Sequence, residues 1–305
     1  MSGGPGARGA ADGPIGDALA DLARAALAED VGAALLDAEG LGEDELLGDP
    51  TAVAVLPESA PIRLALAAQA DGVAAGLALL APLYAAVDRA VTVTTHLADG
   101  DRVLPGEPVA TLEGPVRALA TGARSARDLL AHAFGIASLT RRYVDALEGT
   151  GVVVRGTRAG LPGLAALQRV AVEAGGGSAQ RMSATDAFVV ERSHIDLAGG
   201  IGPATLQALT DQRQRPVVVE VDDLDELDAA LAAGAREVRC LGLVVDDLAE
   251  AVTRCRRWPQ PVLVEAAGVV TPTSAPDVAA TGVDALAVPG LTQAPPPVPL
   301  DLVVG

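Results

Sequence analysis

The chain has 305 residues, enough to bury a sizeable core in one or two domains. Half of the residues are hydrophobic and only 2% are aromatic, so the core must be built from Ala, Val and Leu. The formal net charge of −18 argues against a nucleic-acid partner, because a phosphate backbone is bound by a basic face. No run of about 18 uncharged apolar residues stands out, so no membrane partner is expected.

The N-terminal residues 1–16 are rich in Gly and Ala and contain no apolar segment. They predict a disordered leader and not a signal peptide. The two cysteines, Cys240 and Cys255, lack the spacing of a metal site and fit a reduced compartment. We therefore expect a cytoplasmic protein.

The first part of the chain predicts a mixture of helices and strands. Residues 17–28 have apolar positions at helical spacing. An insertion of acidic and glycine residues follows at about 33–47. Strands are expected over 61–68, 91–97 and 109–113, with a hairpin region at 100–107. Residues 116–148 predict long helical segments joined near Gly135.

From residue 152 onward, short apolar runs alternate with helical stretches. The six predicted strands are Val152–Val154, Ala187–Val190, Val217–Val221, Val238–Leu241, Val262–Val264 and Ala285–Val288. The predicted helices are 161–174, 203–212, 224–233, 245–256 and 273–280. This alternation predicts an α/β fold with a parallel sheet, closed as a barrel with its site at the carboxyl ends of the strands.

Residues 152–200 carry the most informative motif of the sequence. It runs through a strand, a Thr-Arg turn, a Leu-Pro-Gly loop, a helix, a triple glycine, Gln-Arg, and a second strand ending in Ser-His-Ile. That order and spacing resemble the nicotinate-nucleotide pyrophosphorylases, which are quinolinate phosphoribosyltransferases. The resemblance covers about 17–303 and implies transfer of a phosphoribosyl group to quinolinate, with decarboxylation and with Mg2+.

The resemblance also implies a domain plan. It implies an N-terminal α/β sandwich domain over 17–125 and an incomplete α/β barrel of about six strands over 126–288. A tail, 289–305, would return to the N-terminal domain.

Several positions match the family's anion-binding cluster, where arginine forks suit carboxylates and phosphates. The matching substrate-binding candidates are Arg124, Arg141, Arg158, Arg181 and His194. Glu220 matches an acidic residue of the family and is the catalytic candidate. Other readings stay open: an arginine of an Arg-rich chain can be a surface residue, Glu220 a solvated acid, and His194 a packing residue in a loop.

Other family positions are lost, and all of the losses fall where chemistry is expected. The departures are Ala159, Gln180, Glu191, Leu241, Ala267 and Gln293. Ala159 and Glu191 stand where the family has lysines, so they change the local charge by −1 and −2; the chain contains no lysine. At an effective dielectric constant near 20, a unit charge at about 4 Å is worth roughly 4 kcal/mol. A metal site is not predicted, because Leu241 replaces a carboxylate.

Three functions remain open from the sequence. The favoured one is a catalytically impaired family member that binds a small anion, or that completes or regulates the site of a paralogue. Since Arg124 matches an arginine that the family places in a neighbouring subunit's site, a homodimer or a heterodimer with a paralogue is expected. The alternatives are an active quinolinate phosphoribosyltransferase that uses Mg2+ and a transferase for a less anionic substrate.

Overall fold

The computed structural model of the chain describes residues 13–31, 49–58, 60–179, 183–211 and 215–304. Two compact units divide the chain. Unit 1 comprises 1–138, 161–175 and 295–305, and unit 2 comprises 139–160 and 176–294, where these are described. The predicted domain boundaries at 125/126 and 288/289 differ from these divisions and stay predictions. The predicted insertion at 33–47 lies outside the described residues, as does most of the predicted leader; residues 14–16 begin the first helix.

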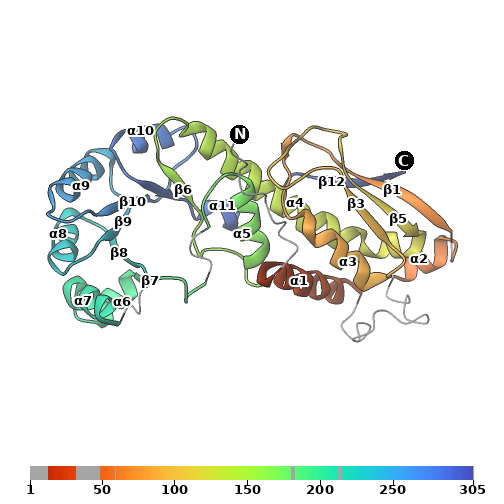
Figure 1. Cartoon of the computed structure of the whole chain (residues 1–305), viewed down its shortest axis with the longest axis horizontal. Helices are drawn as coiled ribbons and strands as arrows, with labels where there is room; N and C mark the ends of the chain where they lie inside the picture. The colour runs from red at the N-terminus through yellow and green to blue at the C-terminus, as the bar shows by residue number, and fades with distance from the viewer. Residues whose placement is uncertain (1–12, 32–48, 59, 180–182, 212–214, 305) are drawn as a thin grey trace, which may run out of the picture. The chain divides into compact units, whose positions relative to one another are not determined.

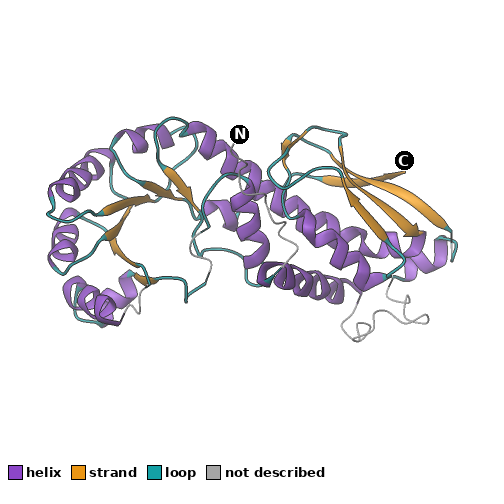
Figure 2. Ribbon diagram, in the orientation of Figure 1, coloured by secondary structure: helices purple, strands orange, loops and turns teal. Residues whose placement is uncertain are grey.

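Unit 1 contains a four-stranded antiparallel sheet with the strand order β12-β1-β5-β3. Its strands are β1 (Pro61–Ala68), β3 (Thr92–Thr95), β5 (Pro108–Pro115) and β12 (Leu300–Val304), and a separate ribbon pairs β2 (Gly72–Val73) with β4 (Arg102–Val103). The helices are α1 (Pro14–Val31), α2 (Pro50–Val55), η3 (Leu77–Leu79), α3 (Leu80–Val87), α5 (Ala165–Ala174) and the part of α4 (Val116–Ala146) that ends at Ser138; the rest of α4 belongs to unit 2. Figure 2 shows helices along one face of the sheet, which confirms the predicted α/β sandwich.

The core of unit 1 follows from the helical spacing of its apolar residues. In α1, Leu19, Ala23 and Leu27 recur at four-residue intervals and are at most 1% exposed, so one stripe of the helix is buried. In β5 the buried run Val109–Leu112 fills the middle of the sheet. Aliphatic side chains thus supply almost all of this core.

The expected break near Gly135 is wrong, because α4 continues from Val116 to Ala146 without interruption. A Cβ atom at position 135 would lie 2.4 Å from the carbonyl oxygen of Pro296. The glycine therefore allows the backbone of residues 296–297 to approach the helix, and it does not end the helix.

Unit 2 is built from six parallel strands with helices outside them (Figure 1). The strands are β6 (Val153–Arg155), β7 (Phe188–Val190), β8 (Val217–Val221), β9 (Glu237–Leu241), β10 (Leu263–Ala267) and β11 (Ala285–Ala287). The helices are α6 (Arg192–Leu197), α7 (Ile201–Asp211), α8 (Leu224–Ala232), α9 (Val245–Arg257), α10 (Ala275–Ala280) and α11 (Gly290–Gln293).

The strand order β6-β11-β10-β9-β8-β7 identifies this sheet as an incomplete barrel. Strands β7 to β11 follow one another as neighbours in chain order, and the first strand, β6, pairs with the last, β11. A doubly wound sheet would instead reverse direction at a switch point. The predicted barrel of about six strands is confirmed, with its opening between β6 and β7.

The helices of unit 2 bury small and aliphatic side chains against the barrel strands. Val238 and Cys240 of β9 are at most 1% exposed, and Cys255 of α9 is also buried. Burial raises the pKa of Cys240 to about 12 and that of Cys255 to about 11. Among the residues that the structure describes, no helix is long and apolar enough to cross a membrane.

Candidate functional site

A cavity of about 390 Å³ lies within unit 2 at the carboxyl ends of the barrel strands. Because the strands are parallel, the residues that follow them meet at one edge of the sheet, where barrel enzymes carry their sites. The lining residues come from the ends of all six strands or from the segments that follow them. They are Thr157, Arg158, Ala159, Glu191, Glu220, Arg239, Leu241, Ala267 and Pro289.

Glu191 faces this cavity and lies beside Arg158. The nearest Arg158 nitrogen and Glu191 carboxylate oxygen are 3.8 Å apart, and the side chains are 45% and 35% exposed. Glu191 is also the N-cap of α6, where its side chain accepts a hydrogen bond from the backbone N–H of His194. The helix start thus holds the carboxylate next to the guanidinium.

A second cation of the cavity, Arg239, is held by carboxylates from both neighbouring strands. In the parallel register Arg239 stands opposite Glu220 of β8 and Glu265 of β10. Its Nη1 donates to Glu220 Oε1 at 3.1 Å, and its Nε donates to Glu265 Oε2 at 2.9 Å. Burial lowers the pKa of Arg239, but the charges and hydrogen bonds of Glu265 and Glu220 outweigh it and raise the pKa above its ordinary value.

The same network continues into the barrel interior through Arg155 and Glu237. Arg155 Nη1 donates to Glu237 Oε1 at 2.6 Å and lies 4.0 Å from Glu265 Oε2. Glu265 is 1% exposed, and its Oε1 has no hydrogen-bond partner within the described part of the chain. The arginine and glutamate side chains of the interior therefore form ion pairs with one another, as buried charges require.

The predicted site residues divide into those that the structure brings together at the cavity and those that it does not. The cavity contains Arg158, Ala159, Glu191, Glu220, Leu241 and Ala267. Gln293 is exposed at the end of α11 and does not line it. Gln180 and Arg181 lie outside the described residues.

Arg141 and Arg124 lie elsewhere in the chain. Arg141 lines a different cavity of unit 2, of about 370 Å³, beside the start of β6, and its Nη1 is 3.6 Å from Asp145 Oδ1. The cavity at the strand ends is not lined by Arg141, and the substrate-binding role of Arg141 stays a prediction. Arg124 belongs to unit 1, where it pairs with Asp30 and lies 3.7 Å from Asp128. The substrate-binding role of Arg124 stays a prediction.

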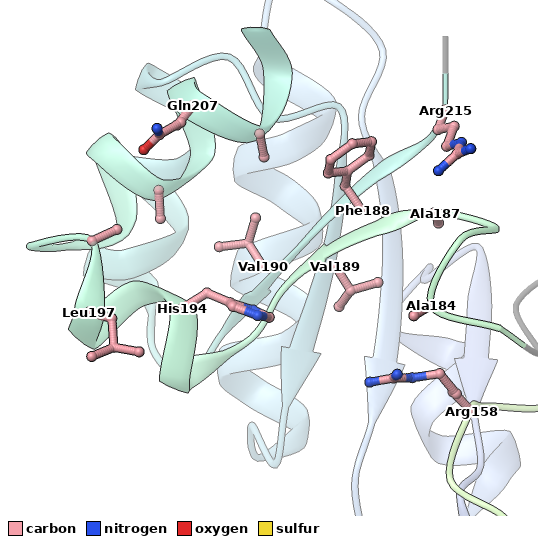
Figure 3. Close-up of a pocket in the computed structure, with 13 residues that line it drawn as sticks. Arg158, Ala184, Ala187, Phe188, Val189, Val190, His194, Leu197, Gln207 and Arg215 are labelled. Atoms are coloured by element: carbon pink, nitrogen blue, oxygen red, sulfur yellow. The ribbon is translucent and has the colours of Figure 1, made fainter. Parts of the chain in front are cut away.

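His194 is not in a loop, as the packing interpretation assumed, but in α6. Its Nδ1 accepts a hydrogen bond from the backbone N–H of Glu191 at 3.2 Å, which completes a reciprocal cap. His194 also lines the larger cavity of unit 2, of about 710 Å³. In Figure 3, Phe188 and Val190 point toward α6 and α7, whereas Val189 and Arg158 lie on the other side of β7.

The larger cavity has a different chemistry from the smaller one. Its lining is mostly Ala, Val, Leu and Phe, and it shares only Arg158 with the cavity at the strand ends. The smaller cavity contains the paired charges and the positions that matched the family. We therefore take the smaller cavity as the candidate site.

The residues of this site do not fit a Mg2+ ion. No group of three or more His, Cys, Asp or Glu side chains that could hold a metal occurs among the described residues. Mg2+ can bind through one or two carboxylates, but both carboxylates of the cavity, Glu191 and Glu220, already neighbour guanidinium groups. Leu241 supplies hydrocarbon where the family has a carboxylate.

The sequence reasoning missed the interior ion pairs of Arg155, Glu237, Arg239 and Glu265, of which only Glu265 is fully buried. A signal was present, because Glu237 and Arg239 alternate with Val238 and Cys240 along one strand. Alternation normally predicts a strand with one solvent-exposed face. In a barrel the second face is the interior, and charges there must be paired.

Comparisons with known proteins agree with this architecture. The sequence profile of the quinolinate phosphoribosyl transferase N-terminal domain matches residues 49–134, and that of the C-terminal domain matches residues 136–303. The nicotinate-nucleotide pyrophosphorylase (carboxylating) of Mycobacterium leprae is 33% identical over 281 residues, which are 91% of this chain and 94% of that protein. A probable enzyme of the same name from Bacillus subtilis is 31% identical over 82% of this chain and 86% of its own length.

Solved structures show the same relationship. The nicotinate-nucleotide pyrophosphorylase of Francisella tularensis superposes with a TM-score of 0.84 at 27% identity, and the alignment covers 98% of this chain and 100% of that one. The chain belongs to the quinolinate phosphoribosyltransferase family.

Proposed function

We propose that this chain is a family member in which quinolinate phosphoribosyl transfer is negligible. One observation carries the proposal: Glu191 lies 3.8 Å from Arg158 in the cavity at the strand ends. A pocket for a pyridine dicarboxylate needs guanidinium or ammonium groups that are available to the substrate. Here one arginine already neighbours a carboxylate, and Arg239 is bound by two.

The proposed ligand carries at most one anionic group, which Arg158 would hold in competition with Glu191. A second anionic group would meet the Glu191 carboxylate at short range, where like charges repel. This restriction supports a ligand that is less anionic than quinolinate.

A second candidate function is ordinary quinolinate phosphoribosyl transfer. The observation that favours it is the 33% identity with the Mycobacterium leprae pyrophosphorylase over 91% of this chain. Arg158 and Glu220 are both present in the cavity and support this candidate as well.

One assay separates the two candidates. The full-length protein is incubated with quinolinate, phosphoribosyl pyrophosphate and Mg2+, and nicotinate mononucleotide is measured. We expect no product above the background of a reaction without protein. Turnover at an ordinary enzymatic rate, about 1 per second or more, would refute the impaired-member proposal.

The proposed assembly is a homodimer or a heterodimer with a paralogue, in the cytoplasm. In a heterodimer this subunit would complete or regulate the paralogue's site. Arg124 is the candidate residue, since its side chain is 67% exposed on α4. Light scattering at micromolar concentration, with and without the paralogue, tests the assembly; a monomer in both samples would contradict it. Arg124→Ala in the chain mixed with an active paralogue should then lower the activity of the mixture.

A further inference from the structure

Arg192, the residue that follows Glu191, ties the start of α6 to the start of α8. Its Nη1 and Nη2 donate to the two carboxylate oxygens of Glu226, each at 2.7 Å, and Nη2 also donates to Asp222 Oδ2 at 2.6 Å. Isolated exposed ion pairs contribute little, but a bidentate guanidinium within a network of carboxylates is the exception. Arg192 lines neither the cavity at the strand ends nor the larger cavity, so any effect on a ligand must pass through a neighbouring residue.

The two carboxylates that bind Arg192 are themselves fixed. The Asp222 N–H donates to Glu226 Oε2 at 3.0 Å, and the Glu226 N–H donates to Oδ1 of Asp223, the N-cap of α8, at 2.8 Å. In the next position along the chain, Leu227 is fully buried. The Arg192 side chain is thus attached to a packed helix of the barrel.

Helix α6 has few other attachments. It has six residues, too few for a helix to be stable alone, and of these six, all within the described part of the chain, only Ile195 is buried. The reciprocal cap between Glu191 and His194 orders the first turn but lies within the helix itself. Strand β7 pairs with β8 as far as Val190, immediately before α6 begins. The direction of α6 beyond that point therefore depends mainly on Ile195 and on Arg192.

The attachment of α6 affects Glu191, because that residue is the N-cap of the same helix. The Glu191 carboxylate lies 3.8 Å from Arg158, and its side chain is 35% exposed, so water is within reach. An exposed pair at this distance is weak, so a carboxylate on a helix that was free to tilt would exchange the guanidinium for water at little cost. With α6 tied to α8, the carboxylate stays in the cavity.

We infer that Arg192 is a positioning residue that determines specificity: by binding Asp222 and Glu226 it holds Glu191 beside Arg158, and it thereby disfavours a ligand with a second anionic group. The inference rests on the proposed function and extends it, since it names the residue that maintains the restriction on ligand charge. Arg192 is positively charged and yet acts against the binding of a dianion, which is opposite to the effect of its charge alone.

This opposition of sign provides the test. Arg192→Met removes a positive charge, and by charge alone it should weaken the binding of the dianion quinolinate. If Arg192 holds Glu191 in place, the same change releases the carboxylate and should instead tighten quinolinate binding, by about two- to fivefold. Affinities are measured on the full-length protein by calorimetry, or by ligand-observed NMR with quinolinate at up to about 50 mM. Thermal unfolding shows whether each variant is folded.

Two further variants and a matched control separate positioning from charge. Glu226→Ala removes the bidentate partner and changes the net charge in the opposite direction, yet it should also tighten quinolinate binding. In a Glu191→Gln background, Arg192→Met should cause no further tightening, because the carboxylate that it positions is absent. Arg254→Met is the control: Arg254 on α9 also binds two carboxylates, at 2.7 and 2.9 Å, but lies outside the cavity, so this change should not tighten binding.

Each outcome decides the inference. Tighter quinolinate binding in Arg192→Met that disappears in the Glu191→Gln background supports it. It is overturned if Arg192→Met leaves the binding unchanged, weaker or undetectable, if the tightening persists without the Glu191 carboxylate, or if Arg254→Met tightens binding equally. Should Arg192→Met fail to fold, Glu226→Ala with and without Glu191→Gln decides by the same criteria. The proposed function fails separately: quinolinate turnover by the unaltered protein refutes it, whatever the affinities of the variants.

Discussion

Reversing the charge at position 191 should convert part of the cavity back to an anion site. In the structure the Glu191 carboxylate lies 3.8 Å from the Arg158 guanidinium. Two unit charges at that distance interact by about 1 kcal/mol in water and about 4 kcal/mol at an effective dielectric constant of 20. The side chains are 35% and 45% exposed, so solvent screening brings the value toward the lower limit.

The substitutions form a graded series. Glu191→Gln removes one negative charge and should tighten quinolinate binding by about 0.5–1.5 kcal/mol, because Arg158 no longer neighbours a carboxylate. Glu191→Lys changes the charge by two and should tighten it by about 1–3 kcal/mol, or about 5- to 150-fold. Arg158→Ala should weaken binding of the same dianion. Lysine also removes the cap of α6, which costs about 1 kcal/mol of stability, so thermal unfolding must be measured for each variant.

Calorimetry with quinolinate is the assay, and Glu250→Lys is the matched control. Glu250 is exposed on α9 and does not line the cavity, so the change of net charge is the same but it falls outside the candidate site. If Glu191→Lys leaves the affinity unchanged, or if the control changes it equally, the carboxylate does not act within the cavity. Either result would refute the electrostatic reasoning.

Three further predictions concern stability and reactivity. Gly135→Ala should destabilise unit 1 by about 1–3 kcal/mol, because the added Cβ would lie 2.4 Å from a backbone oxygen. Gly202→Ala is the control, since position 202 on α7 has open space around it, and this change should be neutral or stabilising. Urea unfolding of the two variants gives the comparison. The two buried cysteine thiols, whose pKa values are raised by burial, should resist a thiol reagent at about pH 7.5 in the folded protein and react after denaturation, and rapid reaction of the native protein would contradict this. The hydrogen bond from Arg192 lowers the pKa of the Glu226 carboxyl in the folded protein. The ionised carboxylate therefore stabilises the fold above the unfolded pKa of about 4.3, and this stabilisation is lost as the pH falls through the lower folded pKa. Arg192→Met should therefore reduce the acid dependence of the unfolding free energy in that window, and an unaltered pH profile would contradict this.

The fold could be predicted from the sequence because its strands and helices have consistent patterns. Runs such as Val217–Val219 are apolar, β-branched and buried, as expected for strands covered on both faces. Gly135 led to a wrong prediction of a helix break, because a glycine is needed there only to let the distant backbone of residues 296–297 approach α4. A contact with a segment far away in the sequence cannot be predicted from the local pattern.

The candidate site was only partly predictable, for a related physical reason. Arg158, Glu191 and Glu220 could be placed from a motif, and all three line the cavity. Arg239 could not, because a lone arginine in a strand is typical of a solvent-exposed face. Only the register across β8, β9 and β10 shows that Arg239 has a carboxylate on each side.

The paired arrangement of charges limits what any single substitution can restore. Removing Glu220 would leave Arg239 with Glu265 alone, and removing Arg239 would take away the guanidinium that both carboxylates bind. Breaking one partner of such a pair is strongly destabilising, by about 3–5 kcal/mol. Residues that share partners also have non-additive effects. A change at position 191 therefore alters only the more exposed part of the site, whereas the barrel interior would have to change at several positions together before the cavity could hold a dianion well.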